Sequence, residues 1–139
     1  MSGFWLAMMS AMIWGLSAFI EKWGLKNADP LGGVFARTVG IVTGCLIFSL
    51  VVPQAPQRFF AMDGRSKLAL MLGGCLASVV AQLFFYRALK FGDIGRVSAI
   101  GGSWPVFAFV LSVLFYHEPL TTQKVLGLVL VMAGAAFLK

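Results

Sequence analysis

The chain has 139 residues, of which 60% are hydrophobic and only 12% are charged. A soluble domain usually carries about 25% charged residues, so polar side chains are too few here to cover a compact globule in water. A disordered segment would be far less apolar. The composition therefore predicts a multi-pass membrane protein with little mass outside the bilayer.

The net charge is +6, from eleven Lys and Arg against five Asp and Glu. These basic residues cluster at the ends of apolar runs and not along one stripe, which is typical of charges that face lipid headgroups. We therefore predict no nucleic-acid partner. Cys45 and Cys75 stand alone inside apolar runs, and we interpret both as packing thiols.

Polar residues divide the chain into five apolar runs, and a membrane helix needs about 20 such residues. The runs cover approximately residues 4–23, 31–52, 68–89, 94–116 and 124–138. They are continuously apolar and do not alternate, which favours helices over barrel strands. The predicted fold is an all-α membrane protein, a bundle of five transmembrane helices in one domain over residues 1–139. Since Met1–Ile20 lacks a basic start and a cleavage site, we expect it to remain as the first membrane helix.

The connections are short, except for the one from Pro53 to Lys67, which predicts a short interfacial element anchored by Arg58, Phe59 and Phe60. Five spans place the termini on opposite sides of the membrane. Seven basic residues on the C-terminal side against four on the other favour a cytoplasmic C-terminus. Without Lys22 and Arg37, which lie inside their runs, the count falls to five against four, so insertion in both orientations stays open.

Small residues recur every four positions on three of the runs, a pattern that predicts close packing between membrane helices. The three stripes are Ala7, Ala11 and Gly15; Ala36, Gly40 and Gly44; and Gly73, Ala77 and Ala81.

Three runs also carry a polar face, and together these faces predict the lining of an amphipathic cavity. The alternative is that hydroxyl groups bond back to their own helices and that the amide joins two helices. Ionisable groups inside a membrane are candidates for function, and Glu21 can pair locally with Lys22 or with Arg37 across the first connection. The candidate substrate-binding residues are Trp14, Ser17, Glu21, Arg37, Gln82, Tyr86, Ser103, Trp104 and Pro105.

The sequence Gly101 to Pro105 interrupts the fourth run, because a proline inside a helix removes a backbone hydrogen bond, here to the carbonyl of residue 101. A broken membrane helix exposes polar backbone groups, which is tolerable only against protein or a water-filled path. We interpret this break as a substrate-lining or moving element, with a static kink as the alternative.

Enzymatic readings have little support in the sequence. His117 is the only histidine, and no Ser-His-Asp set, paired carboxylates or glycine-rich phosphate loop can be assembled. Because the remaining carboxylates lie in connections, no acid sits at mid-membrane for a proton-coupled mechanism. We predict no catalytic residue, no metal ligand and no cofactor.

Several short motifs resemble the EamA group of the drug/metabolite transporter superfamily. The first run reads WGLSAFIEKWGLKNADP and leads into Arg37, and the stretch from Ala88 to Phe137 resembles that group's strongest region. Glu118, although a family-like position, is interpreted as a cap of the fifth helix. The matching positions are Trp14, Gly15, Lys22, Arg37, Ala88, Leu89, Pro105, Glu118, Gln123, Gly127 and Gly134.

The resemblance implies a multi-pass inner-membrane transporter that exports small amphipathic metabolites or amino acids. Members commonly hold two five-helix units, and a second copy of an odd-span unit must insert inverted. A lone unit is therefore expected to pair, as an antiparallel homodimer or as a heterodimer with a similar small protein, giving half of a ten-helix inverted-repeat architecture that works by alternating access. The alternatives are a flippase for lipid-linked headgroups and a non-transporting subunit that stabilises a partner.

Overall fold

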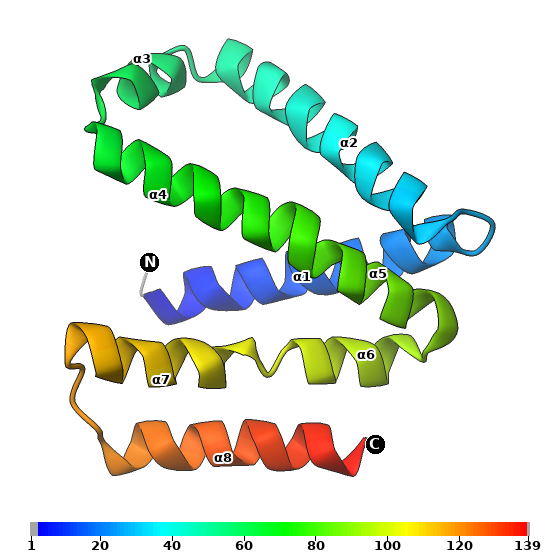
Figure 1. Cartoon of the computed structure of the whole chain (residues 1–139), viewed down its shortest axis with the longest axis vertical. Coiled ribbons are helices and arrows are strands. Elements are labelled where there is room, and N and C mark those ends of the chain that lie inside the picture. The colour runs from blue at the N-terminus through cyan, green and yellow to red at the C-terminus, as the bar shows by residue number, and fades with distance from the viewer. Residues whose placement is uncertain (1–2, 139) are drawn as a thin grey trace. The chain divides into compact units, whose positions relative to one another are not determined.

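The structure, a computed structural model, describes residues 3–138, and over that range it contains helices and no strand (Figure 1). The prediction of an all-α fold is confirmed. In chain order the elements are α1 (Gly3–Leu25), α2 (Pro30–Val51), α3 (Gln54–Ala61), α4 (Gly64–Cys75), the π-helical turn η1 (Leu76–Val80), α5 (Ala81–Phe91), α6 (Ile94–Gly101), α7 (Trp104–Tyr116) and α8 (Thr122–Phe137).

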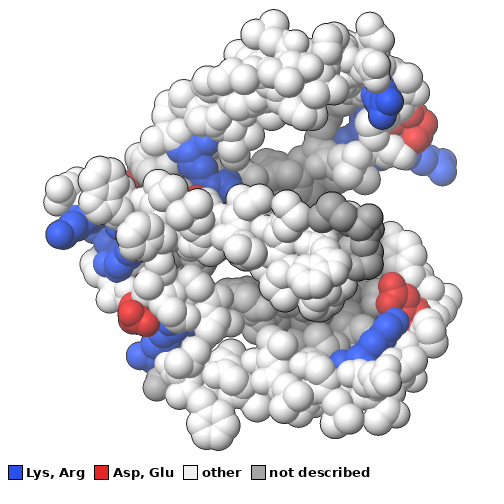
Figure 2. All heavy atoms as spheres, turned by 180° about the vertical axis from the view of Figure 1, so that it is seen from behind, with Lys and Arg blue, Asp and Glu red and all other residues white. Residues whose placement is uncertain are grey.

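Four helical stretches are long and apolar enough to cross a membrane, and α8 is a shorter apolar helix. The third of the four is continuous through α4, η1 and α5, and the fourth contains α6 and α7. With 16 residues, α8 rises about 24 Å at ~1.5 Å per residue, against a hydrocarbon core of ~30 Å. On the face shown in Figure 2 most atoms belong to uncharged residues, as expected of helices that face lipid.

The described residues form two compact units. One contains residues 20–90, and the other contains the residues up to Phe19 and those from Phe91 onward. The prediction of one domain over residues 1–139 stays a prediction, and the two units are described separately below.

Aspartates in the connections start three of the helices by accepting backbone hydrogen bonds, the usual role of an N-cap carboxylate. Asp29 accepts from the amide of Leu31 at 2.8 Å, and Asp93 accepts from the amide of Arg96 at 3.1 Å. Asp63 starts α4, and hydrogen bonds from Ser66 hold its pKa below the usual range. These carboxylates therefore fix where the spans begin.

Glu118 does not cap the fifth helix, so that expectation is wrong. Thr121 is the N-cap of α8, and its hydroxyl oxygen accepts from the amide of Lys124 at 3.4 Å. Glu118 lies three residues before this cap, after His117 has ended α7 in a left-handed conformation with φ 51°. Its carboxylate instead forms an ion pair with the Lys124 ammonium group at 3.3 Å.

The fourth span is broken where the sequence predicts, but Pro105 is not a mid-helix kink. It lies in the first turn of α7, where a residue without an N–H loses no helical hydrogen bond. The two residues between the helices are held by the preceding turn: the amide of Gly102 donates to the carbonyl of Ser98 at 2.7 Å, and the Ser103 hydroxyl donates to the carbonyl of Ile100 at 2.6 Å. The break is thus a hydrogen-bonded turn between two helices.

The unit of residues 20–90 packs at one end of its helices. Leu25, Val34, Tyr86 and Leu89 are at most 8% exposed there. The close approach in this unit is at Gly33, where a Cβ atom would lie 2.9 Å from Leu25 Cδ2 and 3.1 Å from Tyr86 Cδ2.

The glycines of the small-residue stripes make no close helix contact within their own units, so the predicted close packing along these stripes stays a prediction. A Cβ atom on Gly40, Gly44 or Gly73 would meet nothing within 4 Å, and the same is true of Gly15 in the other unit. A spacing of four residues identifies a helical face, but it does not say whether that face meets another helix of the same chain.

We expect Gly33→Leu to destabilise the protein, because its side chain would overpack the contact with Leu25 and Tyr86 at a cost of about 1–3 kcal/mol. The matched control is Gly32→Leu, which makes the same change of helix propensity where nothing lies within 4 Å. Unfolding free energies in mixed micelles provide the measurement. Equal stabilities of the two variants would contradict the packing described at Gly33.

Candidate functional site

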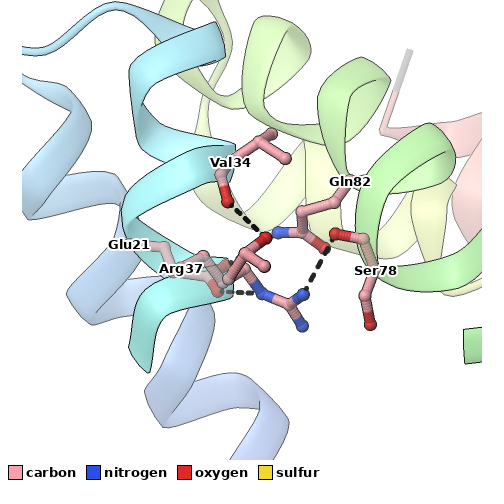
Figure 3. Close-up of polar contacts among 6 residues, drawn as sticks. Glu21, Val34, Arg37, Ser78 and Gln82 are labelled. Carbon is pink, nitrogen blue, oxygen red and sulfur yellow. Dashed lines mark hydrogen bonds and ion pairs between the residues drawn. The ribbon is translucent and has the colours of Figure 1, made fainter. Parts of the chain in front are cut away.

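An ion pair joins the first two spans. The Arg37 Nε atom lies 3.2 Å from the Glu21 Oε1 atom, and the two side chains are 29% and 16% exposed respectively (Figure 3). Glu21 lies one turn before the end of α1, and Arg37 lies about two turns into α2. Of the two pairings open from the sequence, the structure therefore contains the one across the connection.

The third span completes the polar contacts of this ion pair. The Gln82 amide nitrogen donates to Glu21 Oε2 at 3.3 Å, and Arg37 Nη1 donates to the backbone carbonyl of Ser78 at 3.4 Å (Figure 3). Charged groups inside a membrane are costly unless they are paired and hydrogen-bonded. We call Glu21, Arg37, Gln82 and the Ser78 carbonyl the polar cluster.

The Ser78 carbonyl lies in a π-helical turn. In η1 the amide of Ala81 donates to the carbonyl of Leu76, five residues back, which widens the helix by one residue relative to an α-helical turn. Such turns are rare and are frequent at functional sites. In the sequence, Ser78, Gln82 and Tyr86 are four residues apart and so share one helical face, but no glycine or proline within residues 76–80 marks the π turn.

Tyr86 lies next to the polar cluster on α5. It is 3% exposed, its ring contacts Gly33, and its side chain interacts with those of Glu21 and Gln82. Tyr86 therefore connects the polar cluster to the packed residues around Gly33.

Beside the polar cluster, two lysines form hydrogen bonds that join α1 to the end of α5 and α5 to the first connection. The Lys22 ammonium group donates to the carbonyls of Leu89 and Lys90 at the end of α5, and the Lys90 ammonium group donates to the carbonyl of Ala28. Cations at a helix C-terminus satisfy terminal carbonyls and interact favourably with the helix dipole. These contacts fix the position of Glu21, the neighbour of Lys22, relative to α5.

The structure thus brings together four of the nine candidate residues, Glu21, Arg37, Gln82 and Tyr86. Ser17 and Trp14 lie one and two turns earlier on α1, in the part of that helix assigned to the other unit. Ser103, Trp104 and Pro105 lie at the break in the fourth span.

Trp104 and Pro105 contribute to a second feature, a groove of about 490 Å³ between α7 and α8. Its walls are mainly apolar, and the ion pair of Glu118 and Lys124 lies on its lining. Ser112 also lines the groove, and its hydroxyl donates back to the carbonyl of Phe109 at 2.9 Å. For Ser112 the helix-internal hydrogen bond, an alternative considered from the sequence, is therefore present.

Neither feature offers a metal site. Within residues 3–138 no three His, Cys, Asp or Glu side chains gather closely enough to hold an ion. The polar cluster has one acid, one base and one amide, which suits recognition of a small polar group by hydrogen bonds and opposite charge.

Apolar helices of membrane-spanning length and an internal ion pair define a multi-pass membrane protein. The chain matches the EamA-like transporter family over residues 1–139 and belongs to it. The resemblance to the EamA group of the drug/metabolite transporter superfamily is thereby confirmed, and the family indicates a transporter and not an enzyme.

Related proteins agree with this assignment. The chain is 34% identical to an uncharacterised transporter of a Sinorhizobium species, over 97% of this chain and 94% of that protein. It is 25% identical to an uncharacterised protein of Methanocaldococcus jannaschii, over 96% and 93% respectively. It is 29% identical to a probable amino-acid metabolite efflux pump of Salmonella typhimurium, over 96% of this chain but 41% of that protein. No solved structure is significantly similar.

We expect strong energetic coupling between Glu21 and Arg37. Glu21→Gln and Arg37→Gln should each destabilise the protein, because each leaves a partly buried charge without its partner, and the double variant should cost less than the sum of the two. Since both side chains keep some exposure, the coupling free energy should be about 1–2 kcal/mol and not the larger value of a fully buried pair. Unfolding free energies in mixed micelles give the double-mutant cycle.

The control is the same cycle on Glu118 and Lys124, whose side chains are 47% and 43% exposed. That pair should couple by less than about 1 kcal/mol. Additive effects of Glu21→Gln and Arg37→Gln would show that the pair is not formed in the folded protein.

Proposed function

We propose that this protein exports small amphipathic metabolites, amino acids among them, across the inner membrane of the cell. Family membership supports transport. The direction and the substrate class are supported by two relatives, from Salmonella typhimurium and Escherichia coli, that are named probable amino-acid metabolite efflux pumps. The chain is 29% and 30% identical to them but spans only 41% of the length of each, so their activity as whole proteins is carried to this chain only as a proposal.

The observation that carries the proposal is the polar cluster. Glu21 and Arg37 neutralise each other, and their side chains remain 16% and 29% exposed, so neither is sealed inside the protein. A substrate carboxylate can take the place of Glu21 at the guanidinium group while a substrate ammonium group binds Glu21. The number of paired charges in the span is then preserved, which avoids the large cost of leaving a charge unpaired in the membrane.

Trp14, Ser17, Ser103, Trp104 and Pro105 remain proposed substrate-binding residues, and of these the two tryptophans are suited to apolar parts of the substrate. Trp104 is 55% exposed, so a large aromatic surface is available. Aromatic side chains recognise apolar groups through large contact areas.

The transport pathway is proposed to be completed by a second copy in the antiparallel orientation, or alternatively by a similar small protein. Without Lys22 and Arg37, which lie inside their spans, the basic residues count only five against four between the two sides of the membrane, and this small difference supports insertion in both directions. At Gly15, Gly40, Gly44 and Gly73 an added Cβ atom would meet nothing within 4 Å among residues 3–138, so these stripes supply surfaces on which partner helices can approach closely. Rocking of this chain against the second copy, or against the similar small protein, would then give alternating access.

In proteoliposomes that contain the purified protein, we expect flux of a radiolabelled apolar amino acid such as leucine. Arg37→Ala should lower this flux by about tenfold or more, because a charge-assisted hydrogen bond contributes ~1.5–3 kcal/mol. Trp104→Ala should also lower it while leaving expression intact.

The matched control is Arg96→Gln, which removes an exposed positive charge at the start of α6 and should leave flux unchanged. Full flux in both Arg37→Ala and Trp104→Ala would contradict the assigned site. Movement of a labelled lipid without leucine would favour the flippase, and flux that begins only when a partner is added would favour the accessory subunit.

A further inference from the structure

The connection between the second and third spans contains a helix of its own. The helix α3 follows the end of α2 at Val51 and precedes the start of α4 at Gly64 (Figure 1). Because both flanking helices are of membrane-spanning length, this connection lies at the boundary between hydrocarbon and water. All of it belongs to the unit of residues 20–90.

A groove of about 470 Å³ runs between the end of α2 and α3. A volume of this size is in the range of pockets that take small organic ligands. Most of its wall is apolar, and its polar groups come from one amide and one guanidinium side chain. The principal lining residues are Phe48, Val52, Phe59, Met62, Gln54 and Arg58.

Positive charge gathers in the connection that forms this groove. Arg58 is exposed in the last turn of α3, and Arg65 and Lys67 lie in the first turn of α4, against Asp63 as the one acid of this connection. Figure 2 shows basic atoms beside acidic ones over the end of the molecule where α3 lies. Asp63 accepts the amide of Ser66 at 2.9 Å as the cap of α4, and its single negative charge leaves the three cations in excess.

Two of these cations are positioned by their neighbours. Lys67 Nζ donates to the carbonyl of Phe60 at 3.0 Å and lies 5.5 Å from the centre of the Phe59 ring, which is itself part of the groove wall. Arg58 Nη2 donates to Gln54 Oε1 at 3.3 Å, which holds the guanidinium group at the groove. The groove therefore offers a ligand two positive charges, from Arg58 and Lys67, next to an apolar surface.

We propose that this groove binds one anionic phospholipid of the adjacent leaflet. An acyl chain occupies the apolar slot between α2 and α3, and the phosphate binds Arg58 and Lys67. Basic residues at the membrane surface attract anionic lipids, and arginine is suited to phosphate by its forked donor geometry. An anionic lipid is favoured over a zwitterionic one because three cations and one acid leave this connection with a net positive charge. This site does not depend on which solute the protein transports.

Native mass spectrometry of the full-length protein in detergent, with equimolar phosphatidylglycerol and phosphatidylcholine as probes, tests the proposal. The wild type should retain phosphatidylglycerol preferentially. The double variant Arg58→Gln/Lys67→Gln should lose this preference by about 5- to 25-fold, since each basic residue near the surface contributes a factor of about five. Arg96→Gln, which removes a charge elsewhere in the chain, should retain it.

A second variant tests the slot without altering charge. Val52→Trp fills the groove, and it should release the bound phosphatidylglycerol while its circular dichroism and elution volume match those of the wild type. Equal retention of the two lipids by the wild type, or unchanged phosphatidylglycerol retention by either groove variant, would overturn the proposal.

Discussion

The ion pair between Glu21 and Arg37 is the constraint on which the rest of the site depends. Two opposite charges within membrane spans are tolerable only as partners, and even then their remaining hydrogen-bonding groups must be satisfied. Here the third span provides those hydrogen bonds, from Gln82 to Glu21 and from Arg37 to the Ser78 carbonyl. One electrostatic requirement therefore draws three spans to the same point and leaves a small, neutral polar cluster in an otherwise apolar unit.

The packing around this cluster explains why it has a defined geometry. Gly33 lets Tyr86 and Leu25 approach α2, and Lys22 and Lys90 join the end of α5 to the first connection by hydrogen bonds to backbone carbonyls. Since lipid offers helices little hydrophobic drive to associate, close packing and hydrogen bonds are the interactions that remain. They are concentrated at the end of the unit next to Glu21, which positions the carboxylate for Arg37.

The sequence predicts the parts of this arrangement that depend on residue type and spacing. Apolar runs give the spans, Pro105 marks the break in the fourth, and the two internal charges allow the pair that forms. The parts that it does not predict depend on the backbone and on the identity of the neighbouring helix. A π turn at Leu76–Val80 has no residue signature, a carbonyl such as that of Ser78 belongs to every residue, and Gly33 lies outside the small-residue stripes.

Solid-state NMR of the protein in lipid bilayers, with ¹⁵N in the Arg37 side chain and ¹³C in the Glu21 carboxyl group, tests the central interaction most directly. The account predicts a strong dipolar coupling between the two labels in the absence of substrate, and a weaker coupling when a transported amino acid saturates the protein. If the coupling is undetectable without substrate, or is the same with and without it, the exchange of ion pairs described here does not occur.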